Sequence, residues 1–493
     1  MLLACVLVTA VGCEQHPQAE SDLASERGAQ ATRTQENHRQ GVILNNRGAL
    51  FLQQGSPRRA LNTLTQAVEL APDLPDAQFN IGLVQARLGR HDEAVAAFAR
   101  AAELGFDQVD LYVAQGLSLR AQNRYAQAAA AFDRALQTAP LRADLHLHRG
   151  EVLRAMGSLD SALASFDTAA RLDTSLGAAH RYRGELLAAS GDQHEAALAY
   201  ERAVRIDPAD VTALVGQAEA LRRLERFDAA TAALQQALSR SPRNSRAHYI
   251  LASVAEAAGD EHLAASARQN FQRLTEARRH FDQGQVYARR GQFDEAANEL
   301  SRAIEVDPEF ADAWLRLGAL RLEDDRPQAA IETLLQVAAL WPEYPEVHNL
   351  TGEAWLQLGE HDKALAAFAA TLAQDPASVA AHIGSGRAHF AEARFSAAQT
   401  EFRQALDLDP DAREGYYFLG LVYAQQGRTR EAVASIEQCL AVSPDHVEAH
   451  YHLGRLLADT GDLPAAREHL IRALALNPDH TRAAQRLAAL DGP

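Results

Sequence analysis

The amino-acid sequence predicts an all-α protein, an α-solenoid of about thirteen units that each contain two helices and two turns. Two observations carry this prediction: small residues recur in two columns with a period of about 34 residues along most of the chain, and prolines recur in the same register. Residues 307–318 read DPEFADAWLRLG, and in the same register 341–352 read WPEYPEVHNLTG, 375–386 DPASVAAHIGSG, 409–420 DPDAREGYYFLG and 443–454 SPDHVEAHYHLG. A single irregular core has no reason to keep such a register, whereas a stack of similar units does.

A column of glycines marks the first helix of each unit. It contains Gly48, Gly82, Gly116, Gly150, Gly184, Ala218, Ala252, Gly284, Gly318, Gly352, Gly386, Gly420 and Gly454. Twelve positions after each of these stands an alanine, without exception, from Ala60 to Ala466. Small residues at two fixed positions indicate that the two helices of a unit touch closely.

Prolines and a second set of glycines predict where the helices end. Prolines such as Pro308 and Pro376 disfavour helix in the residue before them, so they close the second helix of a unit. Between the two columns another glycine recurs, for example Gly359 and Gly427, and it suits a left-handed cap on the first helix. Each unit is therefore predicted to be a helix, a turn, a second helix and a second turn.

These residues resemble the tetratricopeptide repeat (TPR), whose pattern of a bulky residue, Gly, Ala, an aromatic, Ala and Pro is met across roughly residues 41–480. The aromatic of the second helix is present as Phe98, Phe132, Phe166, Tyr200, Phe368 and Phe402, and Leu or Ile stands there in most other units. The resemblance implies a right-handed superhelix with a concave groove lined by the first helices, and a role in binding proteins.

The seventh unit departs from the pattern. It has Ala252 for glycine and Arg268 where the aromatic belongs, and the next glycine, Gly284, arrives earlier than the register requires. Residues 261–282 contain neither Pro nor Gly, so they are predicted to form one long helix or a helix with a barely broken turn, and we expect a change of superhelical pitch near 262–282. The arginines of this segment are either an anionic-partner site or a solvated helix face: Arg268, Arg273, Arg278 and Arg279.

Five segments follow from these patterns. We expect a lipoprotein-like signal peptide at 1–13, a flexible polar linker at 14–40 and an N-terminal solenoid of about seven repeats at 41–275. A C-terminal solenoid of six repeats follows at 276–480, and residues 481–493 form a capping helix and tail.

The amino terminus predicts a lipid anchor. Residues 2–11 form an apolar run too short to span a membrane but suited to the hydrophobic region of a secretory signal. Residues 10–13, AVGC, resemble the lipobox of bacterial lipoproteins, which implies lipidation of Cys13, although no Lys or Arg precedes the run and Ala10 stands where leucine is commoner. We expect a lipid-anchored protein of the cell envelope that faces the periplasm; the alternative is a cytoplasmic protein.

Composition and motifs argue against several classes of function. The net charge is −17, which disfavours binding to a phosphate backbone. Three cysteines are too few for a disulfide framework or a zinc site, and Cys439 stands where the repeat usually has alanine. There is no H-E-x-x-H, phosphate loop or G-x-S-x-G motif, so we expect no enzyme, no cofactor and no metal.

Histidines form a column four positions before the glycine column, with members such as His146, His382 and His450. One interpretation is that histidines of successive repeats bind metal ions between them. However, successive members belong to successive repeats, and packed helices lie ~8–10 Å apart, too far for two of them to share a metal ion. Trp314 and Tyr112 stand in the same column, so we expect a bulky, partly buried side chain there.

The resemblance points to the groove as the binding site, and we expect it in the last repeats. Candidate peptide-binding residues are Arg387, Phe390, Tyr417, Tyr451 and Arg455, because aromatics and arginines supply most binding energy at such surfaces. We expect both tyrosines to lie outside the packing columns.

The same face of earlier repeats carries opposite charges three positions apart. Glu151 with Arg154 and Glu219 with Arg222 are expected to neutralise each other. In the first repeats, asparagines resemble those of chaperone-binding members of the family, but the accompanying lysines are absent, so that function is not inferred: Asn45, Asn46 and Asn80.

The predicted function is a non-catalytic scaffold that binds extended peptides or proteins in the groove. One alternative is an assembly factor for a pilus, a secretin or an exopolysaccharide export machine. Another is the substrate-recruiting arm of a separately encoded enzyme such as a glycosyltransferase.

Overall fold

The computed structural model describes residues 17–342 and 344–491, and this part of the chain contains 26 α-helices and no strand. The all-α prediction is confirmed. The helices fall into two compact units whose boundary in the sequence lies between Arg124 and Tyr125. No helix in the described residues is long and apolar enough to cross a membrane.

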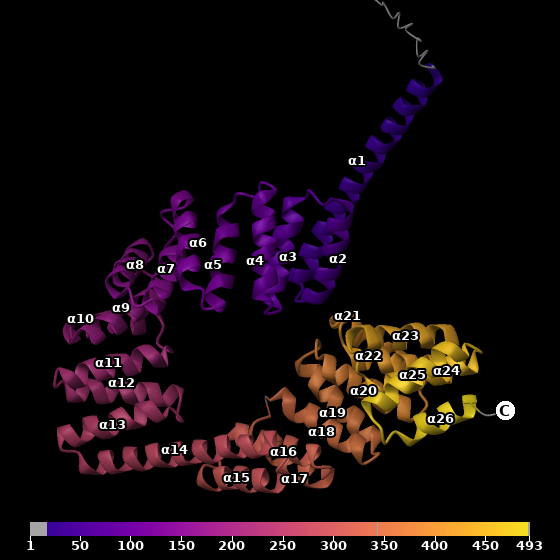
Figure 1. The fold of residues 1–493 in the computed structure, drawn as a ribbon. Helices are drawn as coiled ribbons and strands as arrows, with labels where there is room; N and C mark the ends of the chain where they lie inside the picture. The colour runs from indigo at the N-terminus through magenta and orange to yellow at the C-terminus, as the bar shows by residue number, and fades with distance from the viewer. Residues whose placement is uncertain (1–16, 343, 492–493) are drawn as a thin grey trace, which may run out of the picture. The chain divides into compact units, whose positions relative to one another are not determined.

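The first unit holds five helices (Figure 1). They are α1 (Pro17–Gln53), α2 (Pro57–Leu70), α3 (Pro75–Arg87), α4 (His91–Glu103) and α5 (Val109–Ala121).

Residues 17–40, which we expect to be a flexible linker, differ from that expectation because they form the first part of α1. This segment is rich in Ala, Glu, Gln and Arg, which are good helix formers, and it prolongs a repeat helix, so no new helix must be nucleated. The predicted signal peptide and Cys13 lie outside the described residues.

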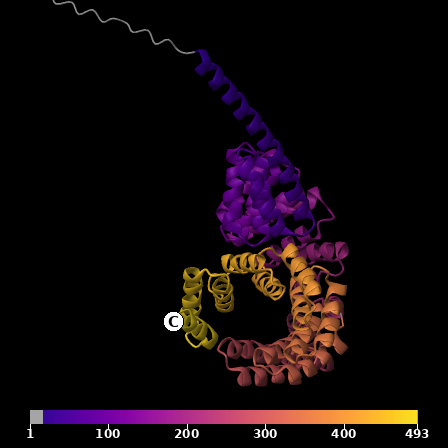
Figure 2. The same ribbon diagram turned by 90° about the vertical axis from the view of Figure 1, so that its right-hand side faces the viewer.

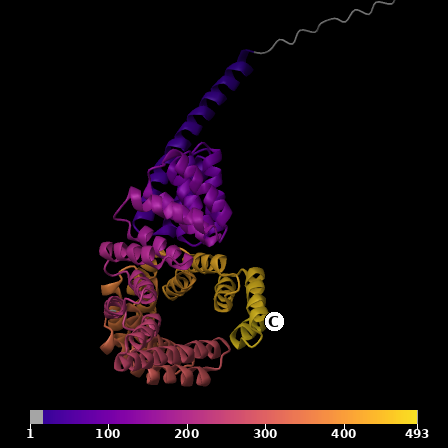
Figure 3. The same cartoon turned by 90° about the vertical axis from the view of Figure 1, so that its left-hand side faces the viewer.

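The second unit holds the remaining helices, which follow one another as antiparallel neighbours. They are α6 (Tyr125–Thr138), α7 (Ala143–Ala155), α8 (Leu159–Leu172), α9 (Gly177–Ser190), α10 (Gln193–Ile206), α11 (Val211–Arg223), α12 (Phe227–Arg240), α13 (Ser245–Ala258), α14 (Glu261–Arg289), α15 (Phe293–Val306), α16 (Ala311–Glu323), α17 (Pro327–Leu340), α18 (Pro345–Gln357), α19 (His361–Gln374), α20 (Val379–Ala391), α21 (Phe395–Leu408), α22 (Arg413–Gln425), α23 (Thr429–Val442), α24 (Val447–Asp459), α25 (Leu463–Leu476) and α26 (Thr481–Asp491). Figures 2 and 3 show α15 to α26, drawn in orange to yellow, following a curved path.

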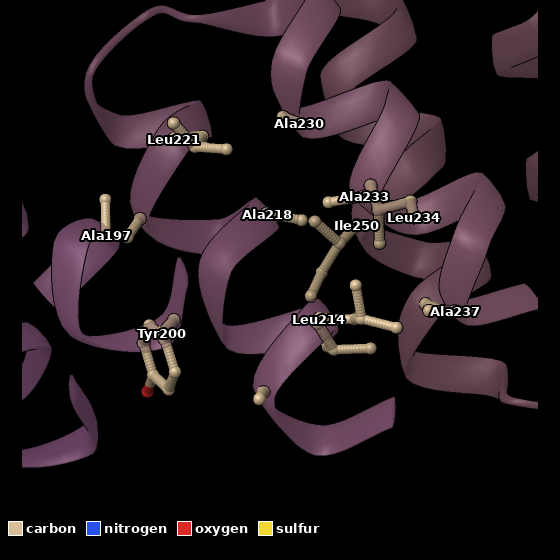
Figure 4. Packing of buried hydrophobic residues seen from close by; sticks show 14 of the residues in the cluster. Ala197, Tyr200, Leu214, Ala218, Leu221, Ala230, Ala233, Leu234, Ala237 and Ile250 are labelled. Carbon is tan, nitrogen blue, oxygen red and sulfur yellow. The ribbon is translucent and has the colours of Figure 1, made fainter. Parts of the chain in front are cut away.

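The glycine column lets the two helices of a repeat touch. A Cβ atom at Gly82 would lie 2.4 Å from the ring of Phe98, and one at Gly150 would lie 2.5 Å from the ring of Phe166, so no side chain fits there. The alanine column is buried in every repeat. Figure 4 shows how the gap between repeats is then filled, with Leu214, Leu234 and Ile250 pointing toward one another.

The second glycines form left-handed caps as predicted, with φ between +72° and +95° from Gly55 to Gly461. Four repeats have another residue in this cap, and each still adopts a positive φ: Asn123 (59°), Glu225 (58°), Asp325 (54°) and Ala393 (57°). The repeat therefore imposes the left-handed conformation even on side chains that disfavour it.

Two further predictions concern helices. The second helix of the degenerate seventh unit continues into the first helix of the eighth, and together they form one helix of 29 residues, α14, as one of our two alternatives predicts. The predicted capping helix is α26, whose Leu487 and Leu490 pack against Leu470 and Ala473 of α25. The division of the solenoid near 262–282 stays a prediction.

Candidate functional site

The five candidate peptide-binding residues lie on α20, α22 and α24, each the first helix of a repeat. Arg387, Tyr417 and Tyr451 belong to a row of side chains in contact. The Arg387 guanidinium carbon lies 5.8 Å from the centre of the Phe418 ring, whose centre is 5.0 Å from that of Tyr417. The His452 ring lies 5.9 Å from Tyr417 and 4.9 Å from Tyr451, so it joins the two tyrosines.

Both tyrosines are half-buried, so the expectation that they lie outside the packing is wrong. Tyr417 packs against the core of repeats eleven to thirteen, and Tyr451 packs against the core formed with the capping helix α26. Burial raises the pKa of Tyr417 to about 12. The physical reason is that each ring reaches the next repeat, where a histidine packs against it.

Three histidines of this row are not among the predicted site residues. His446 stacks on Tyr417 with ring centres 5.0 Å apart, and His480 lies 4.9 Å from Tyr451. Burial, and to a smaller extent the nearby charge of Arg455, lowers the pKa of His452 to about 4, so its ring is neutral at pH 7. The sequence carries one signal for them, since His446 and His480 stand at the same position of successive repeats.

His446 and His480 also cap helices. The Nδ1 atom of His446 accepts the backbone N–H of Ala449 at 3.2 Å at the start of α24, and Nδ1 of His480 accepts that of Ala483 at 3.1 Å at the start of α26. Each ring replaces the Ser or Asp side chain that usually satisfies a free N–H at a helix start.

The two candidate arginines differ in their partners. Arg387 donates to Glu353 at 2.7 Å, so its charge is already paired within the fold. Among the described residues, Arg455 has no carboxylate within ion-pair distance, and its buried Nε has no hydrogen-bond partner. Arg455 therefore keeps hydrogen-bonding capacity for a ligand. Phe390, also on α20, packs on the second helix of its own repeat, with its ring centre 5.9 Å from that of Phe395.

A pocket of about 360 Å³ lies on α18, α19 and α20. Asn349, Thr371 and Ser378 contribute to its lining. The side-chain oxygen of Asn349 is buried without a hydrogen-bond partner in the described structure. Because the oxygen has almost no exposed surface, it accepts an N–H from a bound backbone once the Asn349 side chain turns toward the pocket.

In earlier repeats of the second unit the charges on the first helices satisfy one another. Arg222 donates to Glu219 at 2.9 Å, as expected. Glu151 and Arg154 have other partners, since Glu151 accepts from the Tyr182 hydroxyl at 2.9 Å and Arg154 donates to Glu185 of the next repeat at 3.3 Å. These charges are neutralised within the protein.

The histidine column has a structural role that the sequence analysis missed. The Nε2 atoms of His146, His248 and His450 each lie 2.9 Å from the carbonyl oxygen of the proline six positions earlier. Trp314 donates its Nε1–H to the carbonyl of Pro308 in the same way, also at 2.9 Å. The column therefore supplies a ring N–H that ties the first helix to the preceding turn. The described residues contain no group of three or more side chains that could hold a metal ion.

The four arginines of the predicted cluster on α14 each have a carboxylate neighbour, which favours the helix-face interpretation over an anionic-partner site. The distances are 3.1 Å for Arg268 to Glu256, 2.6 Å for Arg273 to Asp307, 2.9 Å for Arg278 to Asp282 and 3.9 Å for Arg279 to Glu276.

Two other groups singled out in the sequence are also satisfied within the fold. Asn80 donates to Asn45 at 2.8 Å in the first unit. Cys439 is fully buried, in keeping with its position where the repeat usually has alanine, and burial raises the pKa of its thiol to about 11.

The repeated helix pairs and the row of half-buried rings define a solenoid scaffold that interacts with other proteins. A family model described as tetratricopeptide repeat matches residues 45–107, 113–176, 156–211, 215–279, 281–345, 320–379 and 383–438, and a second model of the same description matches 423–490. The chain belongs to the tetratricopeptide-repeat family.

Individual relatives are more distant. "Tetratricopeptide repeat protein 28" of Mus musculus is 32% identical over 94 residues, which are 19% of this chain and only 4% of that protein. Among solved structures, the APC/C hetero-tetramer Cut9-Hcn1 matches with 16% identity and a TM-score of 0.42 over 91% of this chain and 96% of that chain. The thermophilic TPR protein TTC0263 of Thermus thermophilus matches with 25% identity and a TM-score of 0.34 over 36% of this chain and 98% of that chain.

Proposed function

We propose that this protein is a non-catalytic scaffold that binds an extended peptide segment of a partner along the first helices α18, α20, α22 and α24. The observation that carries the proposal is the row of side chains from Arg387 to Tyr451, which combines half-buried aromatic rings with unused polar groups. Rings of this kind supply contact area at a small entropic cost.

The polar groups of the row provide the directional contacts. Arg455 has an unpaired guanidinium one helical turn from Tyr451, and the hydroxyls of Tyr417 and Tyr451 make no hydrogen bond within the described part of the chain. Asn349 adds an unpartnered acceptor in the pocket on α18 to α20. An extended peptide exposes N–H and C=O groups at regular intervals, so it can satisfy several of these groups at once.

The earlier repeats of the second unit are less suited to the same task. Their first helices present Glu219 paired with Arg222, and Arg154 paired with Glu185. A ligand there must break an existing ion pair before it gains a new one, which reduces the net gain.

The test uses variants that keep the rings in place. A cross-linked partner is identified, its bound segment is synthesised, and its affinity is measured calorimetrically for the wild type, Arg455→Gln and the double variant Tyr417→Phe with Tyr451→Phe. We expect each variant to bind at least about tenfold more weakly. The matched control is Glu219→Gln with Arg222→Gln, which should bind normally. Equal binding by all of these chains contradicts a site in the last repeats.

We further propose that Cys13 is lipidated and anchors the protein in the cell envelope, facing the periplasm. The proposal rests on the apolar residues 2–11 and on the lipobox-like residues 10–13. More than one acyl chain is needed for firm attachment, since a single chain binds a membrane only marginally.

Cell fractionation of the full-length protein tests this anchor. Cys13→Ser should release the protein from the membrane fraction or leave it unprocessed, whereas Cys5→Ser should leave the wild-type distribution unchanged. Wild-type protein that is found in the cytoplasm with Met1 intact contradicts the proposal.

A further inference from the structure

The hydrophobic core of the second unit is thin at the middle of α14. One cluster of buried residues extends from Leu187 to Ala267, and the next begins at Ala277. Between these two alanines Leu274 is the one buried apolar residue of the helix, and Phe271 is half-buried. The repeats before and after this point therefore share a helix but few buried apolar side chains.

The thin core at this point follows from the missing turn. α13 lies along the first half of α14, and α15 lies along the second half (Figure 1). Since both neighbours run antiparallel to α14, the start of α13 and the end of α15 both approach its midpoint. The loops before α13 and after α15 are far apart in the sequence, yet Arg243 of the first donates to the carbonyl of Glu309 in the second at 3.3 Å.

A buried carboxylate lies where these loops meet α14. Asp307 has no exposed surface, and it contacts two arginines. Nη1 of Arg273 lies 2.6 Å from its Oδ1 atom, and Nη2 of Arg243 lies 2.7 Å from its Oδ2 atom. The three residues come from the middle of α14, the loop before α13 and the end of α15. We call them the Asp307 clamp.

The same turn position behaves differently in other repeats. The Oδ1 atoms of Asp207 and Asp375 accept the backbone N–H two positions further on, at 2.9 Å and 3.1 Å. These carboxylates only stabilise their own turn. The carboxylate of Asp307 is instead shared between the side chains of Arg273 and Arg243, which both come from earlier repeats.

Aromatic contacts support the clamp on one side. The Arg243 guanidinium carbon lies 4.1 Å from the centre of the Phe310 ring, and this ring lies 4.9 Å from that of Phe281 on α14. Arg243 is thus held by a carboxylate, a carbonyl and a ring. The buried carboxylate of Asp307 would lose all its partners only if both arginines were removed.

We propose that the Asp307 clamp is the lock of a hinge at the midpoint of α14 and sets the angle between the repeats before and after this helix. Long helices bend gently with little resistance, so tertiary contacts decide how far α14 bends. Few buried apolar side chains lie at this point, and the clamp adds polar contacts between the repeats on either side. A partner that binds on both sides of α14 selects the angle at which the clamp closes.

Distance measurements between spin labels on the full-length chain test the lock. The labels are placed at Gln235→Cys on α12 and Gln336→Cys on α17, after Cys5→Ser, Cys13→Ser and Cys439→Ala. In Asp307→Asn we expect the mean distance to shift or the distribution to broaden by roughly 5 Å, the displacement that a bend of about 10° produces about 30 Å from its pivot. A second pair, Glu201→Cys with Gln235→Cys, lies wholly before α14 and should be unchanged.

Two further variants complete the test. Asp375→Asn removes the carboxylate at the same place of another turn and should leave both label distances unchanged. Arg243→Gln leaves the ion pair of Asp307 with Arg273 intact. If Asp307→Asn does not fold, the distance between the labels at residues 235 and 336 is measured in Arg243→Gln instead. Unchanged distances between residues 235 and 336 in folded clamp variants overturn the proposal.

Discussion

Gly386 on α20 lies so close to Phe402 on α21 that a Cβ atom at residue 386 would come within 2.5 Å of the ring. The same relationship recurs between Gly352 and Phe368, also at 2.5 Å. Leucine and isoleucine come about as close, since a Cβ atom at Gly48 would lie 2.5 Å from Leu64 and one at Gly420 would lie 2.6 Å from Ile436. The glycine column is therefore required by the close approach of the two helices of a repeat, with either kind of facing side chain.

Gly386→Ala should destabilise its repeat by about 1–3 kcal/mol, because the added methyl group forces Phe402 from its place. Replacing the ring as well, with Phe402→Leu, should recover part of this loss, since Ala218 is already accommodated opposite Leu234 in the natural sequence. Urea unfolding and hydrogen exchange of α20 and α21 measure both effects. Additive losses in the double variant would show that the contact does not explain the glycine.

Ala393→Gly should stabilise the protein by about 1 kcal/mol, because Ala393 adopts a φ of +57°, which costs an alanine but not a glycine. Gly427→Ala is the matched control at the same cap of the next repeat, where φ is +72°, and it should destabilise by a similar amount. The midpoints of urea unfolding should rise for Ala393→Gly and fall for Gly427→Ala. A change in the same direction for both variants contradicts the argument.

His452 should make the C-terminal repeats less stable in acid. Its pKa is lowered to about 4 by burial, so below its ordinary value of about 6.5 the unfolded chain takes up a proton that the folded chain refuses. The contribution of His452 to the free energy of unfolding is thus fully present above pH 6.5. It falls by roughly 1.4 kcal/mol per pH unit as the pH drops toward 4.

His452→Phe should remove this pH dependence, because Phe418 occupies the same place of the previous repeat without a titrating group. The measurement is urea unfolding of both chains at about pH 7.5 and about pH 5. If the variant and the wild type lose the same stability in acid, another group is responsible.

His146 should tolerate tryptophan better than phenylalanine. Its ring nitrogen bonds to the carbonyl of Pro140, and Trp314 makes the equivalent bond to Pro308. Phenylalanine keeps the bulk but lacks a donor, so His146→Phe should cost about 1 kcal/mol relative to His146→Trp. Thermal unfolding of the two variants decides this, and a better-tolerated phenylalanine would show that bulk alone matters.

Much of the fold could be predicted from the sequence because the repeat uses the same local contacts thirteen times. The spacing of Gly150, Ala162 and Pro140 places a close helix contact and a turn without knowledge of the rest of the chain. The long helix α14 and the capping helix α26 follow equally from local signals, the absence of Pro and Gly in one and the helical spacing of leucines in the other. Such rules act within one repeat, so a single sequence is enough to apply them.

The contacts between repeats were decided by the tertiary structure. The sequence placed Tyr417 and Tyr451 on the first helices, but only the fold brings His452 between their rings and leaves Arg455 without a carboxylate among the described residues. It also joins Arg243 to the distant Asp307, because α14 omits a turn and brings two loops to its midpoint. Periodicity determines which face of a helix a residue occupies, whereas its partner depends on the angle at which the next repeat stacks, and that angle is set by all the packed side chains together.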